Sequence, residues 1–271
     1  MEFTLTEEHT LIRDAARAIA EEKLKPYARE LDENETVRLE TIQELGELGY
    51  MTMMIPEEFG GAGLDTISYV LVLEEFSRVC ASTGVCVSVN NSLFSDGVYK
   101  FGNEAQRKTY LPPMGDGRAQ ACISLSEPGA GTDVGATRTT AVKSGSDYIL
   151  NGKKNFATNG GFADYSLVLV STDPEAGHKG LSMIIVEKGT PGFSVGRHEL
   201  KLGIRGSDTS ELLYDNCRVP QSNRLGEEGK GLSMALTILN GGRIGIAAQA
   251  LGIAQAAYED AVQYSKERQQ F

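Results

Sequence analysis

The sequence predicts an α+β protein in three regions: an N-terminal helical domain over residues 1–118, a middle β domain over 119–225, and the start of a C-terminal helical domain over 226–271. Three observations predict this order. Apolar residues recur at helical spacing to about residue 118, short apolar runs divided by turn residues follow, and helical spacing returns after Gly231. With 41% hydrophobic and 23% charged residues, the 271-residue chain has globular composition.

In the first region, two pairs of residues have the spacing of a capping box, in which side chain and backbone at a helix start bond each other reciprocally. Thr4 and Glu7 precede the amphipathic run 11–19, and Asn103 and Gln106 open a short helix before two prolines. The segment 67–79 is more uniformly apolar and is expected to form a central helix.

The middle region holds short apolar runs at 148–150, 166–170, 182–186 and 212–214. Asn151-Gly152 follows the first run and predicts a hairpin turn there. The spacing of these runs favours an antiparallel sandwich or barrel over alternating strands and helices.

The last region contains alanines spaced three and four apart, which predicts that a second helix packs closely against their face. These alanines are Ala247, Ala250, Ala254, Ala257 and Ala261. The helical pattern then reaches Phe271 without a terminator, from which we expect a C-terminally truncated chain.

Bulk charge and the reactive residue types exclude several classes of function. A net charge of −11 argues against nucleic acid or an anionic membrane as partner, and no apolar run is long enough to span a bilayer. The four cysteines form no CxxC pair, which favours free buried thiols in a cytoplasmic protein. The three histidines are far apart, so we expect no metal site and no Ser-His-Asp triad.

The stretch SLSEPGAGTDV, residues 124–134, is similar to a nucleotide-binding loop, because Gly129 and Gly131 lie two apart with Asp133 close behind. Its glycines do not fit the Rossmann fingerprint, and the β-branched residues after it predict a strand where that fold needs a helix. A loop between strands remains, whose hydroxyls and backbone N–H groups suit a polar ring or a phosphate. An ordinary glycine-rich turn is the alternative reading.

Six motifs in order along the chain resemble the acyl-CoA dehydrogenase family, in particular its short-chain or butyryl-CoA type. They are IPEEFGG at 55–61, LSEPGAGTD at 125–133, NGKKNFATNG at 151–160, GIRGSDT at 203–209, GGRIGIA at 241–247 and ERQQF at 267–271. The resemblance spans the whole chain and implies that family's helix–sheet–helix architecture.

The resemblance implies FAD as the cofactor, with the first loop and the segment 156–158 on either side of the flavin ring. Two residues near the end of the chain are expected to reach the FAD of a neighbouring subunit, so the resemblance also implies a homo-oligomer, a dimer of dimers. The implied FAD-binding residues are Ile123, Leu125, Ser126, Thr132, Phe156, Ala157 and Thr158, with Arg268 and Phe271 acting across the subunit boundary.

The resemblance also implies an acyl-CoA substrate, contacted by Thr132, Asn240, Gly241, Gly242 and Arg243. Asn240 stands where the family commonly has an acidic residue. The segment 90–96 is expected to line the acyl pocket.

The implied reaction is α,β-dehydrogenation of a short-chain acyl-CoA, in which a Glu removes the α-proton, hydride passes to the flavin, and electrons go on to an electron-transferring flavoprotein. One subgroup of the family carries this Glu where the present chain has Gly242. No catalytic base is therefore expected in this chain, and the Glu is expected after Phe271. A cytoplasmic location is expected, or the mitochondrial matrix for a processed eukaryotic protein. The alternatives are an enoyl-CoA reductase and, if the chain is complete, a non-catalytic flavin- or CoA-binding module.

Overall fold

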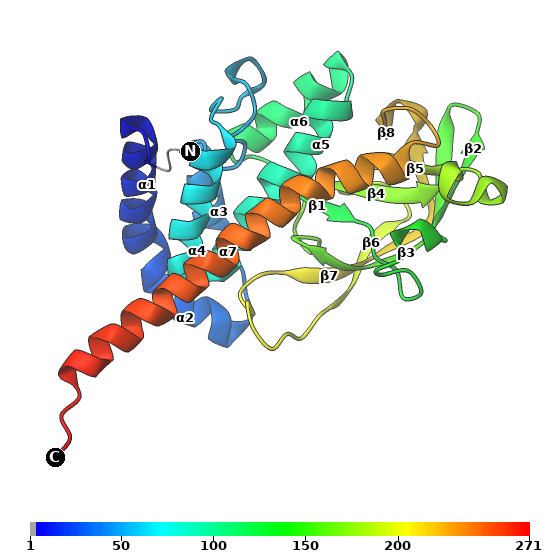
Figure 1. The fold of residues 1–271 in the computed structure, drawn as a ribbon. Helices are drawn as coiled ribbons and strands as arrows, with labels where there is room; N and C mark the ends of the chain where they lie inside the picture. Colours follow the sequence, from blue (N-terminus) through cyan, green and yellow to red (C-terminus); the bar gives the residue numbers. More distant parts are fainter. Residues whose placement is uncertain (1–3) are drawn as a thin grey trace.

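A computed structural model describes residues 4–271. Helices of the first region lie beside a β-sheet, and one long helix, α7 (Gly231–Glu267), runs from the sheet along the helical region (Figure 1). This order of helices, strands and helix confirms the predicted α+β class. One buried apolar cluster joins the two regions and includes Phe94, Leu167 and Ile238. None of the helices in the described residues has the length and hydropathy needed to cross a bilayer.

The helical region ends at Gly115 and includes two π-helical segments, each continuous with an α-helix. Its elements are α1 (Glu7–Ile19), the π-helical Ala20–Leu24, α2 (Lys25–Asn34), α3 (Leu39–Glu47), α4 (Thr66–Ser88), the π-helical Val89–Ser95, α5 (Asp96–Phe101) and α6 (Glu104–Gly115).

The two predicted capping boxes have different outcomes. Asn103 and Gln106 form theirs, because each side chain accepts from the other's backbone N–H, at 2.9 and 3.0 Å. The prediction for Thr4 is wrong: Thr6 caps α1 and accepts from the N–H of His9 at 3.1 Å. Thr6 directly precedes the first helical residue, so its hydroxyl lies within reach of an N–H that the helix leaves unpaired.

The middle region forms one sheet of eight strands within the described residues, in the order β6-β7-β3-β2-β4-β5-β8, with β1 paired to β4. The sheet is mixed, not purely antiparallel as predicted, because β4 runs parallel to β1 and to the first residue of β2. The long connections between these partners permit parallel pairing. The strands are β1 (Ala121–Ser124), β2 (Thr140–Ser144), β3 (Asp147–Thr158), β4 (Tyr165–Ser171), β5 (Leu181–Glu187), β6 (Phe193–His198), β7 (Thr209–Pro220) and β8 (Arg224–Leu225).

Asn151 and Gly152 do not form the predicted hairpin turn. They lie inside β3, opposite a bulge of β7, and the hairpin between β2 and β3 turns at Gly145 instead. Gly152 has φ +146°, and a Cβ there would lie 2.5 Å from the Thr139 hydroxyl. Glycine at this position therefore permits β3 to approach Thr139, the residue before β2, closely. A turn and a close backbone approach both favour glycine, so the dipeptide alone does not separate the two.

Helix α7 packs closely on α4, but not through the predicted alanine face. The alanines at 247, 250, 254, 257 and 261 are exposed in this chain. The buried face carries Gly242, Gly245, Ala248 and Gly252 instead. A Cβ on Gly252 would lie 2.3 Å from the carbonyl oxygen of Glu74, so glycine is what permits the short distance between these helices.

Candidate active site

Two segments that are distant in sequence, 125–127 and 154–156, lie side by side. The N–H of Asn155 donates to the carbonyl of Ser126 at 2.8 Å. Beside this bond β3 bulges, since Asn155 and Phe156 together stand opposite one residue of β7. Phe156 has φ +61°, an unfavourable value for a residue other than glycine. Bulges and such backbone values are common where a side chain is directed towards a functional site.

The expected flavin contacts fall into three groups in this region. Phe156 is 60% exposed, which is unusual for a phenylalanine in a sheet. Ile123, Ser126 and Thr158 are half-buried. Leu125 and Ala157 are buried among core side chains, so only their backbone can reach a ligand at the surface.

Several polar groups here have no hydrogen-bond partner within the described part of the chain. No hydrogen bond among residues 4–271 uses the N–H or hydroxyl of Ser126, or the hydroxyl of Thr158. The side-chain oxygen of Asn155 is buried and also lacks a partner among these residues. Buried polar groups are nearly always paired, so such a group beside an exposed aromatic ring fits a ligand that supplies the partner.

A buried ion pair, which sequence reasoning missed, lies behind these groups. The ammonium of Lys154 is 2.8 Å from Glu127, with side-chain exposures of 0% and 8%. Burial lowers the pKa of Lys154 to about 8, despite the opposing effect of Glu127. Burial opposes ionisation of Glu127, yet hydrogen bonds from Lys154 and Thr139 hold its pKa below the usual value. The sequence did offer one sign of this burial. Side chains two apart on a strand share a face, so Lys154 lies on the same face of β3 as the buried Tyr148 and Leu150.

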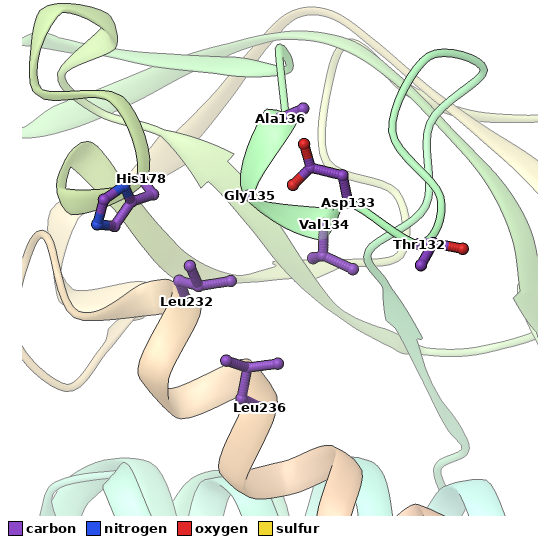
Figure 2. A pocket seen from close by; sticks show the side chains of 8 residues that line it. All are labelled: Thr132, Asp133, Val134, Gly135, Ala136, His178, Leu232 and Leu236. Atoms are coloured by element: carbon purple, nitrogen blue, oxygen red, sulfur yellow. The ribbon is translucent and has the colours of Figure 1, made fainter.

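Thr132 lines a cavity of about 500 Å³ between its loop and the first turns of α7. Figure 2 shows Thr132 to Ala136 on one side, Leu232 and Leu236 on α7, and His178 from the connection before β5. Ser126, Phe156 and Thr158 do not line this cavity. Sequence reasoning missed Leu232, Leu236 and His178, although the spacing of the two leucines places them on one helix face.

A second, apolar cavity of about 300 Å³ lies between α7 and the junction of α4 with its π-helical continuation. None of the residues that line it is acidic: they are Val85, Ser88, Val89, Leu93, Leu239, Gly242, Arg243 and Ile246. Of the segment 90–96, only Leu93 lines this cavity. Asn90 and Asn91 are buried instead in bonds to the backbone N–H groups of Ala121 and Met53, at 2.9 and 2.7 Å.

The expected CoA-contacting segment 240–243 is divided between two sides of α7. Gly242 and Arg243 line the apolar cavity, whereas Asn240 and Gly241 line a cavity of about 590 Å³ on the other flank, with Asp96 and Tyr69. Arg243 is exposed and donates to the side chain of Asn240. Consecutive helical residues point about 100° apart, so no single ligand face includes all four.

Arg268 and Phe271 follow the end of α7, and both are exposed. This end of the helix projects away from the sheet (Figure 1). The chain itself therefore does not bring them to the other expected flavin contacts.

Comparison with known proteins identifies the family. The N-terminal, middle and C-terminal domains of acyl-CoA dehydrogenase match residues 6–118, 122–217 and 229–271. The short-chain-specific acyl-CoA dehydrogenase of Clostridium acetobutylicum is 47% identical over 271 residues, all of this chain and 72% of that relative. Acryloyl-CoA reductase (NADH) of Anaerotignum propionicum is 42% identical, over all of this chain and 69% of its own length.

Solved structures agree. Butyryl-CoA dehydrogenase from Megasphaera elsdenii superposes with a TM-score of 0.97 at 43% identity, covering all of this chain and 72% of its own. A chain from a structure of the electron-transferring flavoprotein of Acidaminococcus fermentans gives 0.98 at 47% identity, covering all of this chain and 71% of its own. These matches and the fold establish that the chain belongs to the acyl-CoA dehydrogenase family of oxidoreductases.

Proposed function

We propose that this protein, with FAD bound, catalyses the α,β-dehydrogenation of a short-chain acyl-CoA. One observation carries the proposal: the Thr132 cavity and the apolar cavity succeed one another along one side of α7. Leu232 and Leu236 line the first, and Leu239, Arg243 and Ile246 line the second, at helical spacing. From Leu232 to Ile246 the helix rises by about 21 Å, so this side suits an elongated ligand with an apolar end.

The residues beside the bulge fit the isoalloxazine ring of FAD. Ser126 and Thr158 offer unpaired donors, the Asn155 oxygen needs a donor, and the exposed Phe156 ring can cover an aromatic surface. FAD, when bound, would accept the hydride that the acyl group loses, and with it the two electrons of the oxidation. We propose that the Ser126 and Thr158 donors stabilise charge on the ring and that Phe156 excludes water from it.

The cavities support the assignment of substrate class. The apolar cavity, of about 300 Å³, would hold the acyl group, and its small volume favours a short chain. Thr132 would bond the CoA portion, and the guanidinium of Arg243 would pair with a carbonyl or phosphate of the substrate. The other two residues of the expected CoA segment, Asn240 and Gly241, line a different cavity, and Asn240 would reach this ligand only beside Arg243, from which its side chain accepts a hydrogen bond.

We propose that the catalytic base is a Glu located after Phe271. Gly242 lines the apolar cavity, at the position where one subgroup of the family carries its base, and none of the residues lining that cavity is acidic. A carboxylate near the acyl group would have to come from elsewhere, and an apolar environment would raise its pKa towards the value that suits a general base.

Assembly and electron transfer are part of the proposal. Arg268 and Phe271 would reach the FAD of a neighbouring subunit in a homo-oligomer, a dimer of dimers, and an electron-transferring flavoprotein would accept the electrons. The four free, buried cysteines support a reducing compartment, the cytoplasm or the mitochondrial matrix. Arg268→Ala is expected to weaken FAD retention. Equal retention after dialysis of variant and wild type would exclude the cross-subunit role.

The 42% identity to a relative named acryloyl-CoA reductase supports a second candidate, an enoyl-CoA reductase that uses the same site in the opposite direction. Anaerobic titration of the flavin-loaded intact protein with acyl-CoAs and enoyl-CoAs of increasing chain length distinguishes the two. Bleaching of the oxidised flavin by a short acyl-CoA supports the dehydrogenase. Reoxidation of the reduced flavin by the enoyl-CoA alone, with no bleaching by any acyl-CoA, supports the reductase. No spectral response to either ligand would leave only a non-catalytic binding module.

A further inference from the structure

The buried pair of Lys154 and Glu127 has no role in the function proposed so far. Removing an ammonium and a carboxylate from water carries a desolvation penalty comparable to what their mutual attraction returns. An apolar pair of similar volume would fill this space without that cost. A fully buried lysine here therefore calls for a function of its charge.

The pair holds together three segments of the chain. The ammonium of Lys154, on β3, donates to the carbonyl of Leu125 at 3.0 Å and to the carboxylate of Glu127 at 2.8 Å. The Glu127 carboxylate also accepts from the N–H groups of Arg138 and Thr139, at 2.8 and 2.9 Å. Through Glu127, residues 138 and 139 before β2 are thus connected to the loop 125–127 and to Lys154 on β3, the two segments that form the candidate flavin site.

The bond to Leu125 determines where the next N–H points. In a trans peptide the carbonyl and the following N–H point in opposite directions, and the described residues contain no cis peptide bond. Because the Leu125 carbonyl is directed at the buried ammonium, the N–H of Ser126 is directed away from it. The Ser126 carbonyl is held in turn by the Asn155 N–H at 2.8 Å, so the backbone on both sides of the N–H is anchored.

We propose that Lys154 is a positioning residue of the flavin site: its charge orients and polarises the Leu125–Ser126 peptide, so that the unpaired Ser126 N–H donates strongly to the bound flavin ring. The inference rests on the proposed function, which places the ring beside Ser126. A charge-assisted bond to the carbonyl strengthens the N–H of the same peptide as a donor. Since reduction adds negative charge to the ring, the reduced form gains more from this donor than the oxidised form does.

The test compares four forms of the intact flavin-loaded protein. Lys154→Met removes the positive charge but leaves the buried Glu127 carboxylate without a counter-charge. The double variant Lys154→Met/Glu127→Gln removes both charges at nearly constant volume, so it avoids a lone buried ion. Lys153→Met is the matched control: Lys153 is the preceding residue on β3, its side chain is 50% exposed, and it pairs with Glu211 at 3.0 Å. The readouts are the reduction potential of the bound flavin and its dissociation constants in both redox states.

Both Lys154 variants are expected to weaken binding of reduced flavin about tenfold more than that of oxidised flavin, a fall of about 30 mV in a two-electron potential. Lys153→Met is expected to match wild type. An unchanged potential in a double variant that still holds flavin would overturn the inference but leave the proposed function intact. Equal weakening for both redox states would overturn it too, because that result indicates support of the loop alone. Wild type that binds no flavin would instead refute the proposed function.

Discussion

Replacing Gly245 by alanine tests whether glycine is what allows α7 to approach α4. A Cβ built on Gly245 lies 2.3 Å from the Tyr69 hydroxyl oxygen and 2.4 Å from that of Ser88. Both distances are far below van der Waals contact. The two hydroxyls are buried and bonded to each other at 2.9 Å, so a shift of either one alone would strain or break that bond.

The expected cost follows from three contributions. Overpacking in a core costs about 1–3 kcal/mol. Loss of the bond between the two hydroxyls costs about 1 kcal/mol. Alanine recovers about 1 kcal/mol through its higher helix propensity. The last two nearly cancel, so the free energy of unfolding of Gly245→Ala is expected to fall by about 2 kcal/mol.

Gly241→Ala is the matched control on the same helix. Its Cβ would have the carbonyl oxygen of Ser92 at 3.4 Å as its nearest contact, an ordinary distance. Helix propensity then dominates, and a gain of up to about 1 kcal/mol is expected. Urea-induced unfolding of the intact protein measures both variants. If Gly245→Ala were as stable as Gly241→Ala, the steric account of the α4–α7 contact would be refuted.

Three further predictions concern the acyl cavity, a buried ion network and the buried lysine. Leu93→Phe should narrow the apolar cavity, and kcat/KM should fall about tenfold or more for each substrate methylene that no longer fits. An assay across acyl chain lengths measures this, and equal losses of kcat/KM for all chain lengths would contradict it. Glu75→Ala removes a buried carboxylate that Arg17 and Arg78 bind at 2.7 and 3.2 Å, so the free energy of unfolding should fall by about 3–5 kcal/mol, and a loss below 1 kcal/mol would contradict this. Because burial lowers the pKa of Lys154 from 10.5 to about 8, the unfolded chain binds more protons between these values, and stability should rise with pH there. Relative to Lys154→Met the rise should approach about 3 kcal/mol by pH 10.5, and parallel stability curves would exclude it.

The local spacing of apolar residues and the order of the segments along the chain were sufficient to predict the fold class. Helical spacing, then short apolar runs, then helical spacing again correspond to the observed order of elements. The Asn103–Gln106 capping box was also predictable, because both partners lie within one turn of helix. The family followed from six ordered motifs, since each requires only the identity of neighbouring residues.

Predictions failed where the outcome depended on partners distant in the chain. Asn151-Gly152 has the composition of a turn, yet the dipeptide lies inside a strand, where Asn151 pairs with Thr140 and Gly152 pairs with Tyr214. The alanine face of α7 has the more regular spacing, yet within residues 4–271 it is exposed and the glycine face packs on α4, because only the facing helix decides how much space a side chain has.

The candidate site divides in the same way. The sequence by itself determined the motif residues, among them Ser126 and Phe156, because the family resemblance is a property of residue order. Only the tertiary structure revealed that Lys154 is buried against Glu127, and that Gly242 and Asn240 face different cavities. Burial and the direction of a side chain depend on which elements pack together, and that packing joins residues up to 181 positions apart, as in the bond between Arg78 and Glu259. Local spacing carries no record of such contacts, so the chemistry of this site was decided by the fold.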